Sequence, residues 1–356
     1  MGGIQMRSTL TVVLPVALLL LVGYGPGDVS AQLLMNGAGA TFPYPLYSKW
    51  FDEYAKVDRS VRFNYQSIGS GGGIRQIMAR TVDFGASDGP MTDEQLEKAP
   101  GALFHIPMVM GAVVATYNLP GSPKLRFTPD LLADIFLGKA TRWTDPRIKA
   151  ANPEATLPDQ PIIVVHRSDG SGTTYIWVDY LSKVSPEWRE KVGRGTSVNW
   201  PVGLGGKGNE GVAGQVKNTP GALGYVELAY AITNRLPAAA IRNRAGTFVL
   251  PSIESTTAAA AGAAKAMPPD FRVSLTDPSG EGAYPVAGFT WLLVYKEQPD
   301  EVRGKVLARF LWWAIHDGQQ YAPRLLYAPL PARVVRMVEV KIKQITYQGK
   351  PLLDAD

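Results

Sequence analysis

The residues with the most evident chemistry lie in the segment Arg167–Thr173, which reads RSDGSGT. The apolar run Pro161–Val165 predicts a strand before it, and Thr174–Leu181 predicts a helix after it. A strand that leads through a glycine turn into a helix brings several free backbone N–H groups to one point, and that point favours an anion. The segment therefore predicts an anion-binding turn.

The side chains of this turn extend the same chemistry. Arg167 can hold tetrahedral oxygens with two hydrogen bonds, Ser171 and Thr173 add hydroxyl donors, and Asp169 is close enough to fix Arg167. A competing hypothesis makes Ser171 the nucleophile of an exported phosphatase or phosphotransferase. That reaction needs a general base and usually a metal, and His166 is the one nearby candidate for the base.

Two further glycine-rich turns lead into predicted helices. In Asn36–Pro43, Thr41 can cap a helix and present its hydroxyl, while the backbone N–H of Phe42 can point outward. In Gln66–Gly73, Ser70 can donate its hydroxyl and its N–H. Taken singly, the first is equally an ordinary helix cap and the second an ordinary flexible loop.

Asp88, in the segment Phe84–Pro90, introduces a carboxylate. Taken alone it is an ordinary turn or capping aspartate. Beside an anion it has a specific use, because HPO₄²⁻ and H₂PO₄⁻ can donate a proton to it, whereas sulfate at neutral pH has none to give. Sulfate would leave two negative oxygens facing each other in a dry site, so Asp88 predicts selectivity by rejection.

The richest glycine stretch, Gly203–Gly211, lacks the spacing of a phosphate-binding P-loop. We interpret it as a structural loop near the cleft. The alanine-rich stretch Ala258–Ala266 is interpreted as a surface helix or loop.

The first residues resemble a secretory signal. Arg7 precedes the apolar run Leu10–Val22, and Val29–Ala31 fits the small-residue cleavage pattern, so the mature chain is expected to start at Gln32. The run is shorter than the ~20 residues of a membrane helix, which disfavours the alternative of an uncleaved anchor. Export without an anchor predicts a periplasmic protein.

Composition narrows the function classes. The chain has no cysteine and 3 histidines, and no histidine spacing typical of a metal site occurs, so neither a metal nor a cofactor is expected. The net charge of +5 is spread along the chain. Nucleic-acid binding favours a clustered basic stripe, so that class is disfavoured.

Helical and strand-like patterns alternate along the chain, which is typical of α/β layers. The predicted helices are 45–57, 73–80, 131–137, 174–181 and 302–321; the predicted strands are 61–68, 84–87, 109–117, 162–165 and 287–295. The long helix at 302–321 carries an apolar face, and its neighbours Trp312 and Trp313 are interpreted as core residues. Without a long linker, the chain is expected to cross between two lobes more than once, with Val109–Tyr117 and Ala287–Tyr295 as hinge strands.

The ordered set of motifs resembles the periplasmic phosphate-binding proteins of high-affinity phosphate ABC transporters, over most of the chain from Asn36 onward. The motifs are GAGATFP at 37–43, IGS at 68–70, VDFGASD at 82–88, RSDGSGT at 167–173, the stretch 200–211 and PGALGYVE at 220–227. The resemblance implies an α/β protein with the class II periplasmic-binding-protein fold, in which two α/β lobes close on inorganic phosphate. It implies a signal peptide at 1–31, lobe I at 32–109 and 286–356, and lobe II at 110–285.

The same resemblance implies a ligand set. Phosphate would be held by Thr41, Phe42, Ser70, Asp88, Arg167, Ser171, Gly172 and Thr173, with Phe42 and Gly172 acting through backbone N–H groups. Asp88 would accept the phosphate proton and Asp169 would orient Arg167. The protein would be a monomeric receptor without enzyme activity that delivers phosphate to membrane permease subunits.

The sequence departs from the family pattern at His166, where some members carry a second arginine, and at Gly71, where a second serine is common. The region Ile241–Pro285 matches poorly. Two other binding functions stay open: a receptor for another oxyanion such as sulfate or molybdate, and an exported phosphate-binding adhesion or stress protein that uses no permease.

Overall fold

The computed structural model describes residues 1–3 and 32–353, and the chain separates into the units Met1–Ala31 and Gln32–Asp356. The expected signal peptide and its cleavage site lie outside the described residues. The fold and the candidate site belong to the second unit. None of the helices in the described part of the chain is both long and apolar enough to cross a membrane.

An eight-stranded mixed sheet runs through this unit in the order β2-β1-β3-β11-β4-β8-β6-β7. Its strands are β1 (Leu33–Gly39), β2 (Val61–Ser67), β3 (Phe84–Ser87), β4 (Leu103–Tyr117), β6 (Ile163–Arg167), β7 (Leu204–Gly206), β8 (Ala222–Glu227) and β11 (Ala287–Tyr295). Strand β1 pairs in parallel with β2 and β3, and β6 pairs in parallel with β7 and β8. The sheet thus has a parallel group at each end, joined by the antiparallel strands β11 and β4.

Strand β4 connects the two parallel groups. Its first part, Leu103–Ala112, pairs with β11, and its last part, Val113–Tyr117, pairs with β8. The strand begins six residues before the predicted start at Val109. Pro107 made a strand unexpected at this position, because proline cannot donate to a sheet. The sheet accommodates Pro107 beside a register shift between Thr290 and Trp291.

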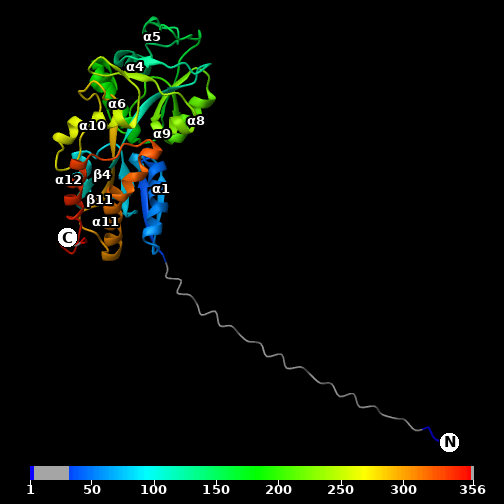
Figure 1. The fold of residues 1–356 in the computed structure, drawn as a ribbon, viewed down its shortest axis with the longest axis vertical. Helices are drawn as coiled ribbons and strands as arrows, with labels where there is room; N and C mark the ends of the chain where they lie inside the picture. The colour runs from blue at the N-terminus through cyan, green and yellow to red at the C-terminus, as the bar shows by residue number, and fades with distance from the viewer. Residues whose placement is uncertain (4–31, 354–356) are drawn as a thin grey trace. The chain divides into compact units, whose positions relative to one another are not determined.

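Helices cover both groups of strands. They are α1 (Tyr44–Val57), α2 (Ser70–Met78), α3 (Asp93–Lys98), α4 (Pro129–Phe136), α5 (Pro146–Ala151), α6 (Gly172–Val184), α7 (Pro186–Lys191), α8 (Gly208–Asn218), α9 (Leu228–Thr233), α10 (Ile253–Lys265), α11 (Glu301–Ile315) and α12 (Ala332–Ile342). The short strands are β5 (Arg126–Phe127), β9 (Ala240–Arg242), β10 (Phe248–Val249), β12 (Thr346–Tyr347) and β13 (Lys350–Pro351). Helices α1 and α11 lie beside β4 and β11, whereas α4, α6, α8 and α9 lie at the other end of the unit (Figure 1).

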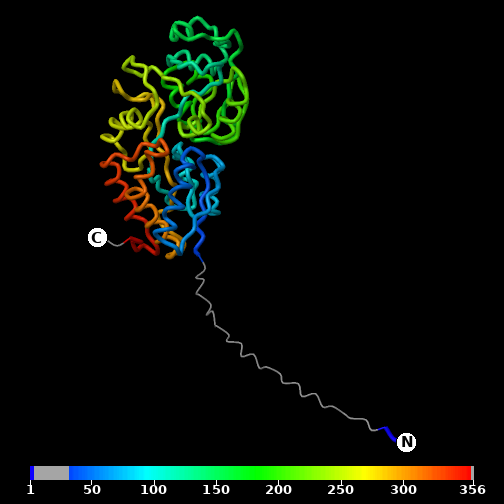
Figure 2. Tube along the Cα trace, turned by 45° about the vertical axis from the view of Figure 1, so that its right-hand side comes forward, coloured from blue at the N-terminus to red at the C-terminus, as the bar shows by residue number. Residues whose placement is uncertain are grey.

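The course of the chain explains this arrangement. The blue start and the orange to red end of the unit lie together, and the green middle of the chain forms the other end (Figure 2). The chain therefore passes between the two ends of the unit more than once, as the absence of a long linker predicts.

Aromatic packing fixes α1 and α11 against the sheet. Phe63 of β2 lies 4.4 Å from Phe310 of α11 and 4.9 Å from Phe51 of α1, between ring centroids, and Tyr54 meets Phe310 edge-on at 5.3 Å. This confirms the apolar face expected for the helix predicted at 302–321. Burying such rings and their neighbours supplies most of the stabilising free energy of a domain this size.

Three local expectations need correction or completion. The helix predicted over 302–321 ends at Ile315, because His316 leaves helical geometry (φ −112°, ψ −98°) and 3-10 turns at Asp317–Tyr321 and Pro323–Leu325 follow. Trp313 packs edge-on against Tyr54, but Trp312 is half-buried outside the core, with its ring tilted against His316 at 4.7 Å. The alanine-rich stretch belongs to helix α10, whose Ser252 cap sets its start.

Candidate functional site

The nine residues singled out from the sequence come together in the structure. They follow the carboxyl ends of the parallel strands: Thr41 and Phe42 after β1, Ser70 after β2, Asp88 after β3, and Asp169, Ser171, Gly172 and Thr173 after Arg167 ends β6. The ends of parallel strands at the same edge of an α/β sheet are the usual place for a ligand. The side chains of Thr41, Phe42, Ser70, Asp88, Arg167, Ser171 and Thr173 are at most 3% exposed.

Arg167 is held in one orientation by Asp169. Its Nε and Nη2 donate to the two carboxylate oxygens of Asp169 at 2.8 and 2.6 Å, and the backbone N–H of Gly208 donates to the same carboxylate at 3.0 Å. Burial disfavours the charge on Asp169, but the hydrogen bonds and charge of Arg167 outweigh it and hold the pKa of Asp169 below its usual value. Nη1 of Arg167 lies 3.4 Å from the Thr173 hydroxyl, so this side of the guanidinium faces the other site residues.

The hydroxyl groups of the site are oriented by N–H donors. The Thr41 oxygen accepts from the backbone and side-chain nitrogens of Asn209 at 3.2 and 2.8 Å. The Ser70 oxygen accepts from the N–H groups of Gly172 and Asp88 at 2.9 and 3.2 Å. A hydroxyl oxygen has two lone pairs and one proton, so occupied lone pairs direct the proton of Thr41 toward an acceptor elsewhere.

Asp88 is the one carboxyl group within this ring of donors that has no arginine partner at hydrogen-bond distance among the described residues. Its Oδ2 lies 3.5 Å from the Ser70 hydroxyl, and its buried Oδ1 has no hydrogen-bond partner within the described part of the chain. Burial raises the pKa of Asp88 to about 7, even though the nearby Thr290 hydroxyl and then the positive charge of Arg167 act in the opposite direction. The group can therefore exchange a proton near neutral pH.

Helix α6 begins at the centre of the site. The Ser171 hydroxyl accepts from the N–H of Thr174 at 3.0 Å, which caps the helix and leaves the hydroxyl proton available to a ligand. The next residue must be glycine, because a β-carbon on Gly172 would lie 2.5 Å from both Asp88 Oδ2 and Ser70 Oγ. The backbone N–H of Ser171 is already used, since it donates to the carbonyl of Thr196 at 2.7 Å.

The two departures from the family pattern have structural explanations. His166 precedes Arg167 on β6, and its ring stacks on Trp200 at 4.7 Å with its Nδ1 3.0 Å from the Arg167 carbonyl. It therefore belongs to an aromatic stack and has no contact with Ser171. The N–H of Gly71 donates to the Gly170 carbonyl at 2.9 Å, and a β-carbon at position 71 would lie 3.1 Å from Gly170 Cα.

Sequence reasoning missed Asn209, because it interpreted Gly203–Gly211 as a structural loop. Gly208 and Asn209 begin α8 after the edge strand β7, and Asn209 is fully buried against Thr41 and Thr173. The signal that was available is the strand, glycine turn and helix pattern, which this stretch shares with the three segments that were recognised.

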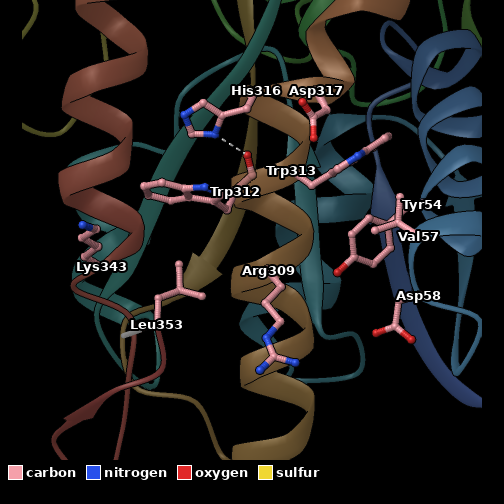
Figure 3. A pocket seen from close by; sticks show the side chains of 10 residues that line it. All are labelled: Tyr54, Val57, Asp58, Arg309, Trp312, Trp313, His316, Asp317, Lys343 and Leu353. Carbon is pink, nitrogen blue, oxygen red and sulfur yellow. Dashed lines mark hydrogen bonds between the residues drawn. The ribbon is translucent and has the colours of Figure 1, made fainter. Parts of the chain in front are cut away.

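A cavity of about 750 Å³ lies elsewhere, between α1, α11 and α12, and contains none of the predicted site residues. Figure 3 shows its lining, in which the ring of Trp312 lies tilted below that of His316. The residues that end three helices, Asp58, His316 and Lys343, line this cavity. The lining includes Arg309 and Lys343 as well as Asp58 and Asp317, so its charges are mixed.

No group of three or more histidine, aspartate or glutamate side chains in the described ranges is arranged to hold a metal ion. The donors around Asp88 are hydroxyls, backbone N–H groups and one guanidinium, which is the chemistry of an oxyanion site.

Comparison with known proteins places the chain in a family. Residues 26–317 match the family described as the PBP superfamily domain. The phosphate-binding protein PstS of Xylella fastidiosa (strain Temecula1) is 49% identical over 316 residues, which cover 88% of this chain and 85% of that relative. PstS of Pasteurella multocida is 48% identical over 87% of this chain and 90% of its own length, and PstS of Methanocaldococcus jannaschii is 41% identical over 86% and 85%.

The chain belongs to the PstS family of phosphate-binding proteins. Solved structures agree in fold: the phosphate-binding protein of Stenotrophomonas maltophilia has a TM-score of 0.66 at 20% identity, covering 87% of this chain and 94% of that one. A high-affinity periplasmic phosphate-binding protein solved with phosphate has a TM-score of 0.69 at 21% identity, covering 90% and 100%. The expected class II periplasmic-binding-protein fold, two α/β lobes with crossing strands between them, is confirmed.

Proposed function

We propose that this PstS-family protein is a receptor that binds inorganic phosphate in a cleft between two lobes and delivers it to an ABC permease for import. The proposed ligands are Thr41, Phe42, Ser70, Asp88, Arg167, Ser171, Gly172 and Thr173, with Phe42 and Gly172 acting through backbone N–H groups. The Gly172 N–H would exchange its present acceptor, the Ser70 hydroxyl at 2.9 Å, for a phosphate oxygen. Asp169 positions Arg167 and tempers its charge. The names of the relatives support phosphate as the ligand.

The observation that carries this proposal is the buried carboxyl of Asp88 within a ring of donors. Anion donors alone would suit sulfate or molybdate as well as phosphate. Oδ1 of Asp88 is buried and has no partner in the described residues, so an oxyanion that brings its own proton satisfies it and one without a proton leaves two acceptors in contact. Among common oxyanions, this favours phosphate at the pH values above about 7 at which Asp88 is mostly ionised.

We propose binding without chemistry, and the surroundings of Ser171 support this proposal. Its hydroxyl oxygen caps α6, and the stacking of His166 on Trp200 keeps that imidazole from acting as its base. Asp169 is engaged by Arg167 and Gly208. A nucleophile needs a base within hydrogen-bond reach, so the phosphatase hypothesis finds no support in this geometry.

We further propose the lobe boundaries 32–109 with 286–356 for lobe I and 110–285 for lobe II, hinged at β4. Hydrogen bonds from Gly71 to Gly170 and from Gly172 to Ser70, both 2.9 Å, would then join the lobes in a closed arrangement. Because the site side chains are at most 3% exposed, phosphate can enter only if the lobes separate. A closed and an open form give a permease two shapes to distinguish.

For the cellular setting, we propose export through a cleaved signal peptide at 1–31, residence in the periplasm, and action as a monomer with membrane permease subunits as partners. A phosphate-binding adhesion or stress protein would keep the same site but would not require a permease. Uptake of labelled phosphate by cells that lack and then regain the gene distinguishes these two roles.

The direct test is equilibrium dialysis of the chain from Gln32 onward with labelled phosphate at about pH 8.5, where Asp88 is ionised, after partial unfolding has removed bound anion. One phosphate per chain that excess sulfate does not displace supports the proposal. Absence of binding, or ready displacement by sulfate, contradicts it. The variant Asp88→Asn, measured in parallel, shows whether the carboxyl accounts for the discrimination.

A further inference from the structure

Asn209, on the first turn of α8, donates hydrogen bonds to two hydroxyl groups of the site. Its Nδ2 donates to the Thr41 hydroxyl at 2.8 Å and to the Thr173 hydroxyl at 3.0 Å, and its backbone N–H donates to Thr41 at 3.2 Å. The side chain is fully buried. One amide thus joins a hydroxyl from the turn after β1 to a hydroxyl from the start of α6.

The direction of this amide is fixed from behind. The backbone N–H of Glu227, at the end of β8, donates to Asn209 Oδ1 at 2.8 Å. Because Oδ1 must face that donor, the Nδ2 group must face the two threonines. The orientation therefore follows from the hydrogen-bond network and does not depend on the ligand.

Donation from Asn209 determines what the two hydroxyls can do. The Thr41 oxygen receives two N–H groups, and the Thr173 oxygen receives Asn209 Nδ2 together with Arg167 Nη1 at 3.4 Å. With its lone pairs occupied, each oxygen can use its remaining proton only as a donor. Hydroxyls that cannot accept from each other keep their protons for the ligand. This raises the affinity of the site for an anion with several oxygen atoms.

We propose that Asn209 is a positioning residue of the phosphate site, which orients the Thr41 and Thr173 hydroxyls as donors and ties the two lobes together on closure. This inference rests on the proposed function, because the oriented protons need an oxyanion to receive them. It adds to that function a residue outside the expected ligand set. It also explains why a buried amide, which carries two donors and an acceptor, is placed at the cleft.

The test is a double-mutant cycle on the chain from Gln32 onward, with phosphate affinity and dissociation rate as readouts. Asn209→Ala is expected to weaken phosphate binding about tenfold or more, mainly through faster dissociation, because one lost polar contact of this kind is worth about one decade. In a Thr41→Val or Thr173→Val background the same substitution is expected to cost much less. A residue that acts through a hydroxyl loses its effect when that hydroxyl is absent.

The matched control is Asn243→Ala. Asn243 is also a buried asparagine, but its Nδ2 donates to the carbonyls of Gly280, Glu281 and Ala283, away from the site. It is expected to lower the thermal stability and leave phosphate affinity within about twofold of wild type, since it touches no site hydroxyl. Asn209→Leu serves if Asn209→Ala does not fold, because leucine is close to asparagine in size and removes the donors without adding a charge beside the anion.

Two results would overturn the inference while leaving the receptor function intact. One is a phosphate affinity of Asn209→Ala equal to that of wild type. The other is a loss of affinity on Asn209→Ala that is the same with and without the threonine hydroxyls, because such a loss indicates a purely structural role. If the wild-type chain itself binds no phosphate, the proposed function fails, and the inference fails with it. The wild-type measurement therefore separates the two failures.

Discussion

Replacing Asp88 by asparagine tests how the site tells phosphate from sulfate. In wild type, sulfate binding requires Asp88 to be protonated, because a carboxylate and a sulfate oxygen would otherwise meet as two acceptors in a buried site. Burial raises the pKa of Asp88 to about 7, so protonating this carboxylate costs little free energy below that pH and increasingly more above it. The asparagine side chain is neutral at every pH and can turn an N–H group toward sulfate.

The size of the effect follows from the pKa. At about pH 8.5, roughly 1.5 pH units above the pKa of Asp88, protonation costs about 2 kcal/mol, which corresponds to about 30-fold in affinity. Asp88→Asn is therefore expected to bind sulfate about 30-fold more tightly than wild type at that pH, and to gain little near pH 5.5. Phosphate should bind less tightly by about 1 kcal/mol, because a neutral hydrogen bond replaces a charge-assisted one.

The assay is isothermal titration or equilibrium dialysis of both anions across this pH range. Wild-type sulfate affinity should fall about tenfold for each pH unit above about 7, and the asparagine variant should show no such slope. The control is Asp179→Asn. Asp179 is equally buried, but its carboxylate accepts from the hydroxyls of Ser274 and Thr276 at 2.6 Å each. This variant is expected to leave the selectivity for phosphate over sulfate unchanged. Equal sulfate affinities of wild type and Asp88→Asn at about pH 8.5 would refute the role assigned to Asp88.

Three further predictions address the site, its titration and its closure. Arg167→Ala should weaken phosphate binding by at least about 2 kcal/mol in titration calorimetry, since it removes a buried charged partner, and wild-type affinity would place the site elsewhere. Because the folded pKa of Asp88 lies above its ordinary 3.8, the unliganded protein should lose stability as pH rises from about 4 to about 7. Relative to wild type, Asp88→Asn should recover up to about 4 kcal/mol at about pH 8 in chemical denaturation, and no difference between pH 4 and pH 8 would contradict this. Small-angle scattering should show compaction when phosphate is added, and an unchanged radius of gyration would argue against lobe closure.

Much of the fold was predictable because its signals are local. Apolar periodicity and glycine turns mark α1, β2, β3 and α6 to within a few residues of their observed bounds. The errors occur where distant residues decide. Pro107 lies inside β4 because the neighbouring strand β11 shifts register there, and the helix after Glu301 ends at Ile315, with Trp50 of α1 donating to the nearby Gly318 carbonyl at 2.7 Å.

The candidate site divides in the same way. The pattern of a strand, a glycine turn and a helix with hydroxyl residues revealed the turns that carry Thr41, Ser70 and Ser171, since backbone N–H groups at helix starts are dictated by local geometry. Asn209 escaped notice because its function lies in which hydroxyls it reaches, across 168 positions to Thr41 and 36 to Thr173. Such partners are not visible in the residues that flank it.

The sequence by itself determined the types of donors, the turns that present them and the Arg167–Asp169 pair, because these depend on neighbouring residues. Only the tertiary structure decided that Asp88 is buried and has a pKa near 7, since its burial depends on residues distant in sequence, among them Ser70, Gly172 and Thr290. It also decided that His166 stacks on Trp200, away from Ser171, since the alternation of β6 sends it to the other face from Arg167. Residues close in sequence supply the donors of an anion site. The surrounding fold makes that site selective, because desolvation depends on what surrounds a group in space and not on its neighbours along the chain.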